Sequence, residues 1–119
     1  MGANSCFDFT GKVCKDGSCS SASNACKHGR VPIVVNSCKS NYSCFKAGFQ
    51  GSIGSIVDSC VGTSACRYAG AEGGSIGNLA SSCNGLNACT GLAHKRGKVK
   101  NVSGSCNGLR ACYWAAGNW

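Results

Sequence analysis

Acidic residues are scarce in this chain of 119 residues, which has 4 Asp and Glu against 12 Lys and Arg and a formal net charge of +8. Hydrolysis of glycosidic bonds usually needs two facing carboxylates, and calcium sites need several oxygen ligands. A Ser-His-Asp arrangement of Asp58 with His28 or His94 is marked by no motif. We therefore expect no enzyme, no cofactor and no metal.

Other absences narrow the class of protein further. No run of 18 apolar residues occurs, so no membrane-spanning segment is predicted. The sequence has no C-x2-C pair and only two histidines, which disfavours a zinc site. The many cysteines predict a secreted or cell-surface protein, yet the opening stretch MGANSCFDF lacks the apolar region of a signal peptide. We therefore expect that a signal peptide was removed or that the chain is a fragment of a larger one.

Cysteine and glycine are abundant, with 12 Cys and 18 Gly. So many cysteines in a short chain are typical of a disulfide scaffold in an oxidising compartment. The even number lets every thiol pair, although twelve cysteines allow about ten thousand connectivities. The excess of basic residues favours anionic partners, and the oxidising compartment makes nucleic acid an improbable one.

A repeat runs through most of the chain. Ser-Cys pairs end at Cys38, Cys60, Cys83 and Cys106, spaced by 22, 23 and 23 residues, and a second cysteine follows each after six residues. The unit reads G-x-[VI]-x-x-[VIL]-x-x-S-C-x-G-x-x-A-C-x-x-A, with S for G and for A in its first copy and L for the final A in its third. The segment with Cys19 and Cys26 is a degenerate copy, as expected for a terminal repeat.

The repeat predicts a fold, because a unit of this size buries its apolar side only by stacking on its neighbours. The spacing Ile53, Ile56, Val57, Cys60 fits a helix, but the Gly, Ser, Val and Asn around it are weak helix formers. Leucine-rich repeats share the period, but their L-x-x-L-x-L core is missing. We predict an all-β, single-domain β-solenoid resembling a parallel β-helix, with about five coils of 22–23 residues.

The organisation of the solenoid follows from the repeat. Residues 1–28 are expected to form an N-terminal cap and a degenerate first coil, residues 29–116 four regular coils, and residues 117–119 a C-terminal tail. Trp114 and Trp119 are expected either to cap the last coil or to form a sticky end. The strand edges at the two ends of a solenoid invite pairing with another chain, so end-to-end self-association into filaments is predicted.

The economical disulfide pairing lies within each unit, since both cysteines recur in every copy. Each disulfide would close a loop of about seven residues and contribute roughly 2–2.5 kcal/mol. Pairing between coils is the alternative. The predicted disulfides are Cys6–Cys14, Cys19–Cys26, Cys38–Cys44, Cys60–Cys66, Cys83–Cys89 and Cys106–Cys112.

This Cys-containing repeat resembles disulfide-stapled β-solenoids, the class that includes small insect antifreeze proteins, over about residues 18–116. Those proteins carry a Thr-x-Thr ice-binding face, whereas here threonine occurs only at Thr10, Thr63 and Thr90. An ice-binding function would have to use Ser and Ala ladders instead. The S-C-x-G-x-x-A-C unit also looks like repeats in large secreted surface proteins of algae.

Two groups of side chains are candidates for binding. The run HKRGKVK, residues 94–100, suits anionic polysaccharide, although a solvated loop explains it equally well. The residues after each second cysteine would stack cations between aromatic rings, but one of these two columns is expected to face the core, because neighbouring strand residues point to opposite sides. The candidate binding residues are Lys46, Arg67, Tyr68, Lys95, Arg96, Lys98, Lys100, Arg110, Tyr113 and Trp114.

Asn41 and Asn101 begin N-x-S sequons and are candidate glycosylation sites. Taken together, the sequence favours a non-catalytic extracellular structural or adhesive module that self-assembles end to end. A binding module for anionic polysaccharide and an ice-binding protein are the alternative functions.

Overall fold

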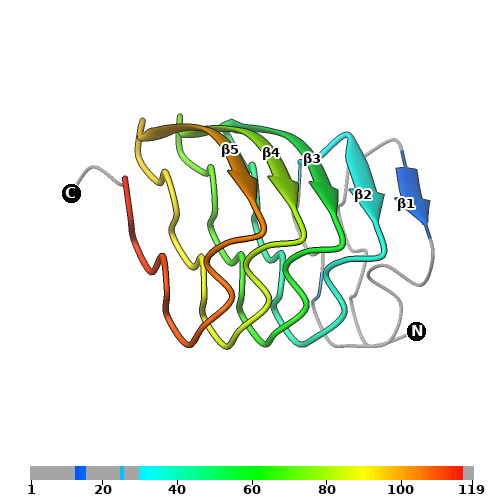
Figure 1. Cartoon of the computed structure of the whole chain (residues 1–119). Coiled ribbons are helices and arrows are strands. Elements are labelled where there is room, and N and C mark those ends of the chain that lie inside the picture. The colour runs from blue at the N-terminus through cyan, green and yellow to red at the C-terminus, as the bar shows by residue number, and fades with distance from the viewer. Residues whose placement is uncertain (1–12, 16–24, 26–29, 117–119) are drawn as a thin grey trace.

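The computed structural model describes residues 13–15, 25 and 30–116, and of residues 13–15 it describes the backbone alone. Five parallel strands form one sheet in chain order: β1 (Val13–Lys15), β2 (Ile33–Val35), β3 (Ser52–Val57), β4 (Ser75–Ala80) and β5 (Lys98–Ser103). Each strand belongs to a separate coil, so the strands stack side by side along the axis of the solenoid (Figure 1). The predicted β-solenoid with a period of about 23 residues is confirmed.

The register of the sheet reproduces the alignment of the repeats. Ile53 pairs with Ile76, which pairs with Val99, and the same holds for Ile56, Leu79 and Val102. Ile53, Ile56, Ile76 and Leu79 are at most 1 % exposed, so the two apolar columns of the sequence are two ladders in the core. The two residues between them, such as Gly54 and Ser55, face outward, which explains a spacing of three inside a strand.

No helix occurs in the described part of the chain, and consequently none there that could cross a membrane. The helical spacing that begins at Ile53 arises from an interrupted strand. Gly54 and Gly77 face each other but are missing from the register, because the ladder passes from Ile53–Ile76 directly to Ser55–Asn78. A strand that skips one residue in this way places two core residues three apart.

The side of each coil opposite the strand is a run of turns, which we call the turn wall: residues 40–51, 62–74, 85–97 and 108–116 (Figure 1). Its backbone amides alternate between hydrogen bonds within the coil and hydrogen bonds to the preceding coil. The amides of Ala65, Arg67 and Ala69 close turns within their coil, whereas those of Ser64, Cys66 and Tyr68 donate to carbonyls of the preceding coil. The turn wall therefore satisfies its backbone without being a strand.

Positive φ angles accompany these turns. Twenty of the described non-glycine residues have φ between 48° and 71°, and none of them lies in β2 to β5. They fall in columns, such as Tyr42, Ser64, Asn87 and Arg110, which occupy the third position of equivalent turns. Non-glycine residues rarely adopt this conformation, so the repeat imposes the same unusual backbone on each coil.

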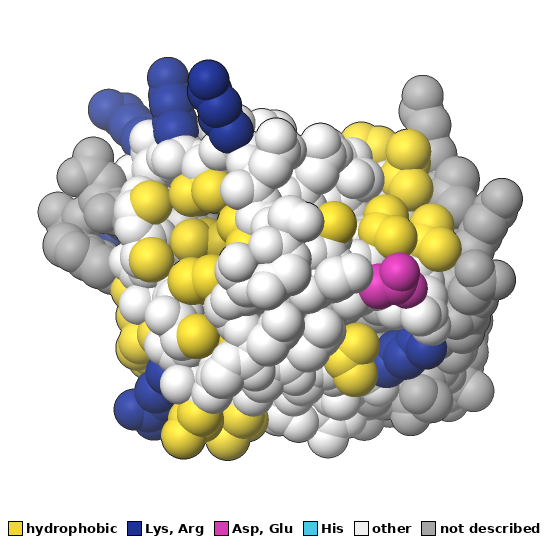
Figure 2. Space-filling model, in the orientation of Figure 1, with side chains coloured by type: hydrophobic (Ala, Val, Ile, Leu, Met, Phe, Trp, Pro, Cys, Tyr) yellow, Lys and Arg dark blue, Asp and Glu magenta, His cyan; other side chains and the backbone are white. Residues whose placement is uncertain are grey.

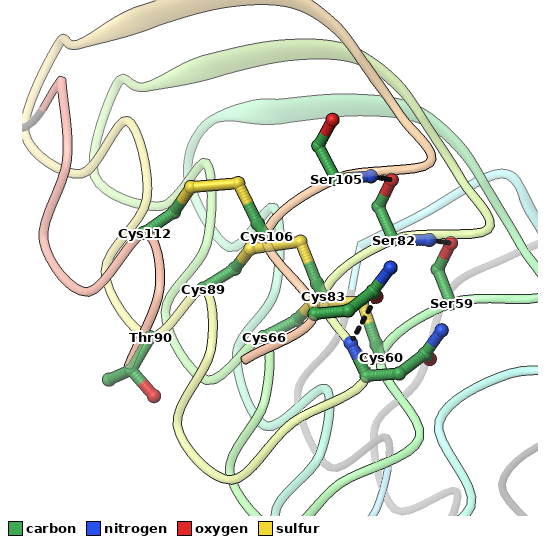
Figure 3. Close-up of a disulfide and its surroundings, with 12 residues drawn as sticks. Ser59, Cys60, Cys66, Ser82, Cys83, Cys89, Thr90, Ser105, Cys106 and Cys112 are labelled. Atoms are coloured by element: carbon green, nitrogen blue, oxygen red, sulfur yellow. Dashed lines mark hydrogen bonds between the residues drawn. A yellow bond between two sulfur atoms is a disulfide. The ribbon is translucent and has the colours of Figure 1, made fainter. Parts of the chain in front are cut away.

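Four of the six predicted disulfides lie among the described residues, and all four are confirmed: Cys38–Cys44, Cys60–Cys66, Cys83–Cys89 and Cys106–Cys112. They lie inside the solenoid, where the sheet side meets the turn wall. Figure 3 shows Cys60–Cys66, Cys83–Cys89 and Cys106–Cys112 stacked on one another. The predicted pairs Cys6–Cys14 and Cys19–Cys26 involve atoms outside the described part of the chain, as do the predicted cap of residues 1–28 and the tail with Trp119.

A ladder of buried serines runs beside the disulfides. The Oγ atom of Ser59 accepts a hydrogen bond from the Ser82 amide at 3.0 Å, and the Oγ atom of Ser82 accepts one from the Ser105 amide at 3.1 Å (Figure 3). Each of these hydroxyls also donates to a carbonyl two residues earlier in its own coil. The invariant serine before each first cysteine is thus a structural residue that connects coils.

Candidate functional site

A chain of aromatic rings crosses the turn wall from coil to coil, and we call it the aromatic ridge: Tyr42, Phe45, Tyr68, His94, Trp114 and Tyr113. Successive ring centroids lie 5.1–6.0 Å apart, mostly edge to face. This separation and geometry are favourable for aromatic pairs. The ridge therefore forms one continuous surface that includes residues more than 70 positions apart in the sequence.

The ridge exists because the two residues after the second cysteine are at least partly exposed in three coils, whereas Thr90 and Gly91 are buried in the remaining one. Phe45 and Lys46, like Arg67 and Tyr68, are partly exposed. The expectation that one of the two columns faces the core is wrong. It assumed the alternation of an extended strand, whereas this segment is a series of turns with positive φ at Lys46 and Tyr68.

The third coil interrupts the ridge with Thr90 and Gly91, and its neighbours fill the space. A Cβ atom on Gly91 would overlap the ring of Trp114 from the next coil. His94 supplies the missing ring, because its centroid lies 6.0 Å from that of Tyr68 and 5.1 Å from that of Trp114. Glycine at position 91 therefore lets Trp114 pack down onto the turn wall.

Cations lie over the rings of the ridge. The Arg67 guanidinium carbon is 5.1–5.3 Å from the ring centroids of Tyr42, Phe45 and Tyr68. The Lys46 Nζ atom is 5.4–5.9 Å from the rings of Phe45, Phe49 and Tyr68. Contacts of this kind are worth about 0.5–2 kcal/mol each, depending on desolvation, so the predicted interleaving of cations and aromatics is present.

The positive charges of Arg67 and Lys46 have no carboxylate partner among the described residues. The ion pair found there joins Glu72 and His94. The Nε atom of Arg67 is buried and donates no hydrogen bond. Rings hold this guanidinium in place, and no described carboxylate compensates its charge, which is an arrangement suited to an incoming anion.

A cleft of about 290 Å³ opens in the ridge and is lined by Lys46, Tyr68, Glu72, His94, Lys95 and Trp114. The His94 Nε2 atom lies 2.6 Å from a carboxylate oxygen of Glu72. His94 is only 8 % exposed, whereas the Glu72 carboxylate is about half exposed. The cleft thus combines aromatic walls, two lysines and one exposed carboxylate.

The candidate binding residues of the sequence fall into two groups in space. Lys46, Arg67, Tyr68, Lys95, Tyr113 and Trp114 lie on the aromatic ridge or in its cleft, with Arg110 over the ring of Tyr113 at 5.4 Å. Lys98 and Lys100 lie on β5, and Arg96 packs near Gly73. Lysine and arginine side chains gather over the start of β5 at the end of the stack (Figure 2). The run HKRGKVK is therefore divided between two surfaces.

Tyr42, Phe49, Glu72 and His94 were missed as members of this site. A signal existed for Tyr42, because it occupies the same column as Arg110. No column of the repeat predicts the contact between Glu72 and His94, because the two residues occupy different positions of the repeat in neighbouring coils. The sequons also differ in setting: Asn41 is exposed in a turn, and Asn101 is exposed on β5, where its side chain accepts a hydrogen bond from Asn78.

The histidine and the aspartate considered for a Ser-His-Asp arrangement have separate partners. His94 pairs with Glu72 and not with Asp58, whose carboxylate accepts a hydrogen bond from Asn36 at 2.7 Å. The densest group of metal-ligand atoms is the sulfurs of Cys89, Cys106 and Cys112. All three sulfurs belong to disulfides, which removes the thiolates that bind metals.

Comparison of the chain with protein-family models, with curated protein sequences and with solved structures gives no significant match.

Proposed function

We propose that this chain is a non-catalytic structural and adhesive module of an extracellular, oxidising compartment, and that its aromatic ridge binds anionic polysaccharide. The observation that carries the proposal is the Arg67 guanidinium, which is stacked on three rings and has no carboxylate partner in the described part of the chain. A guanidinium recognises sulfate and carboxylate groups through paired hydrogen bonds.

The ridge suits a polymer better than a single small anion. Lys46, Arg67 and Arg110 are distributed over three coils, with aromatic rings between them. Coils repeat about every 4.8 Å, so sugar units laid along the ridge meet charges and rings in alternation. The exposed Tyr113 ring, 44 % accessible, offers an apolar face to the C–H side of a sugar.

The cleft beside Trp114 supplies the second kind of contact that a sugar acid needs. Lys46 and Lys95 at its rim are donors for a carboxylate or sulfate, and the exposed Glu72 carboxylate accepts from hydroxyl groups. His94 holds that carboxylate in position. Proteins bind such ligands where a few polar groups converge on an otherwise apolar concave surface.

The experiment compares two double variants that remove the same charge. Calorimetric titration with heparin and with polygalacturonate should show binding by the parent chain, which weakens with salt. K46Q/R67Q should weaken binding by about tenfold or more, since each charge-assisted hydrogen bond is worth roughly 1.5–3 kcal/mol.

The control is K98Q/K100Q, which removes two positive charges from β5 and leaves the aromatic ridge intact. It should lower the affinity by no more than about threefold, the screened long-range effect of net charge. Equal losses in the two double variants would show that binding follows net charge alone, and no binding by the parent chain would refute the proposal directly.

Two other predicted functions remain predictions. Ice binding would use the outward face of the sheet, and a null result in a thermal hysteresis assay would close that possibility. End-to-end assembly depends on the terminal strand β5, whose outward residues differ from those of β3 and β4.

A further inference from the structure

The outward column of the sheet that contains Gly54 and Gly77 continues in β5 as Lys100. In both interior coils this residue lies between the two core residues of its strand, Ile53 and Ile56 in β3 for example. The sheet register passes over the column, so its residues form no regular pair with the next strand. The column is glycine in β3 and β4 and lysine only in the last strand.

Glycine occupies this column in β3 and β4, the two six-residue strands that another strand follows. A Cβ atom on Gly54 would lie well under 3.0 Å from the carbonyl oxygen of Gly77, and a Cβ atom on Gly77 would lie equally close to that of Lys100. Real Cβ atoms essentially never approach other atoms below 3.0 Å. The backbone of the following coil thus occupies the volume that a side chain would need.

Lys100 carries a Cβ atom at this position, in the last strand of the sheet. A further coil with the same geometry would place a carbonyl oxygen on that atom. We propose that Lys100 bars the six-residue ladder from continuing beyond β5, and that this end of the solenoid is thereby closed to a second copy of the chain.

The coil of β2 provides a natural comparison, because Pro32 occupies the same column there. The pairing of β2 with β3 begins only at Ile33–Ser55, whereas β3 and β4 also pair at the two preceding positions. Where the column holds a residue with a Cβ atom, the ladder lacks its first two residue pairs. A tethered coil tolerates that loss, but a separate molecule would have to associate through three residue pairs.

Other features of the last coil would accept a neighbour. A Cβ atom on Gly108 would meet nothing closer than the Cβ atom of Ala111 at 4.0 Å, whereas the equivalent Gly85 is crowded by the coil above it. The Cys83 amide donates to Ser105 in the next coil, and Cys106 has no such acceptor among the described residues. The obstruction is therefore specific to β5.

Charge reinforces the steric effect. Lys98 and Lys100 replace Ser75 and Gly77 of the preceding strand, so the exposed edge of the sheet carries two positive charges. Lysines on an edge strand are a common protection against pairing with other chains. Two copies meeting through β5 would also bring like charges together.

The test adds a coil to the full chain. A copy of residues 94–116 is inserted between Ala116 and Gly117, which places the original Lys100 between two coils and preserves the spacing of 23 residues. Three forms are compared, with Lys, Ala or Gly at the original position 100. In the Gly form, exchange of the first amides of the copied strand should slow about a hundredfold.

In the Lys and Ala forms the same amides should exchange within about threefold of the unprotected rate, because the Cβ atom and not the charge blocks the ladder. Protection in the Lys form, protection in the Ala form, or its absence from the Gly form would each overturn the proposal. The parent chain should sediment as a monomer up to about millimolar concentration, and oligomers with protected β5 amides would equally contradict it.

Discussion

The two sides of each coil are stabilised by different kinds of interaction. The sheet side, β1 to β5, uses extended backbone and buries two aliphatic ladders. The turn wall uses a backbone with positive φ at many non-glycine positions and buries mainly alanine and cystine. The side with ordinary backbone needs no cross-link, whereas the strained side is fastened by one disulfide in each coil from Cys38 to Cys112.

This difference has an energetic basis. A non-glycine residue at positive φ costs about 1–2 kcal/mol relative to ordinary helical or extended backbone. Alanine buries little apolar area, so Ala47, Ala69 and Ala88 stabilise the turn wall far less than Ile53 and Leu79 stabilise the sheet. The disulfides offset the deficit because they restrict the unfolded chain. The aromatic ridge, with its ring and cation contacts, adds stabilisation on the same side.

Reduction of the disulfides should have the largest effect on this comparison. The four described bridges contribute about 8–10 kcal/mol if their contributions add, which is comparable to the whole stability of a domain of this size. The fully reduced chain should therefore lose its strand signal in circular dichroism at 25 °C. If the amides of β3 and β4 stay protected after complete reduction, the sheet is stable without the turn wall and the comparison is wrong.

Removing single pairs sharpens the same point. C60A/C66A removes a bridge whose two cysteines are fully buried, whereas C106A/C112A removes one that is partly exposed in the last described coil. The interior pair should cost about 2–5 kcal/mol of unfolding free energy, the usual range for a native disulfide, and the terminal pair distinctly less. Chemical denaturation of both variants, compared with the parent chain, measures the difference.

The serine ladder, at the boundary between the two sides, should show an intermediate effect. In S59A the buried amide of Ser82 loses its acceptor, and the Val57 carbonyl loses one of its two donors while keeping the Ser81 amide. A buried polar group left without a partner costs about 1–3 kcal/mol. The unfolding free energy should fall by that amount in denaturant titrations.

The matched control is S105A in the last coil. The Ser105 hydroxyl is exposed and donates to Ser103 in its own coil, and no described residue donates to it. This variant should stay within about 0.5 kcal/mol of the parent chain. Equal losses in both variants would mean that the serine matters through its own turn, and that the connection between coils contributes nothing.

The sequence predicts the sheet side well, because the matched columns of the repeat and the weak helix formers around them outweigh the helical spacing that begins at Ile53. The matched positions of Ile53, Ile76 and Val99 become a register, and the S-C-x-G unit correctly indicates a cystine within each coil. Twenty-three residues per coil, repeated four times, leave few other ways to bury these columns.

The turn wall is predicted less well, because its backbone has no single residue signature. Positive φ is familiar for Asn87, whose type tolerates it, but a similar angle occurs at Ser64, Tyr68 and Trp114. The alternation of an extended strand does not hold there, so the prediction that one aromatic column faces the core is wrong. The contact between Glu72 and His94 depends on where unlike columns meet, which only the folded coils reveal.

The smallest effect, and the most direct test of the contrast, comes from two serine-to-glycine variants. Ser64 has φ 56° in the turn wall, and no hydrogen bond of its side chain is found. Ser52 is exposed in β3, where the backbone is extended. In S64G the free energy of unfolding should rise by about 0.5 kcal/mol, because relief of the strain at positive φ outweighs the entropy that glycine adds to the unfolded chain.

In S52G the free energy of unfolding should fall by about 0.5–1 kcal/mol, because glycine adds entropy to the unfolded chain and an extended strand has no positive-φ strain to relieve. The two variants share one chemical change, so side-chain size cancels when their unfolding free energies are compared at equal denaturant dependence. Loss of the 3.4 Å hydrogen bond from the Ser52 hydroxyl to Ser75 acts in the same direction as the loss expected for S52G. The two changes in unfolding free energy should have opposite signs. If both variants are destabilised, Ser64 adopts its positive φ without strain. The disulfides would then not be needed to offset backbone strain in the turn wall.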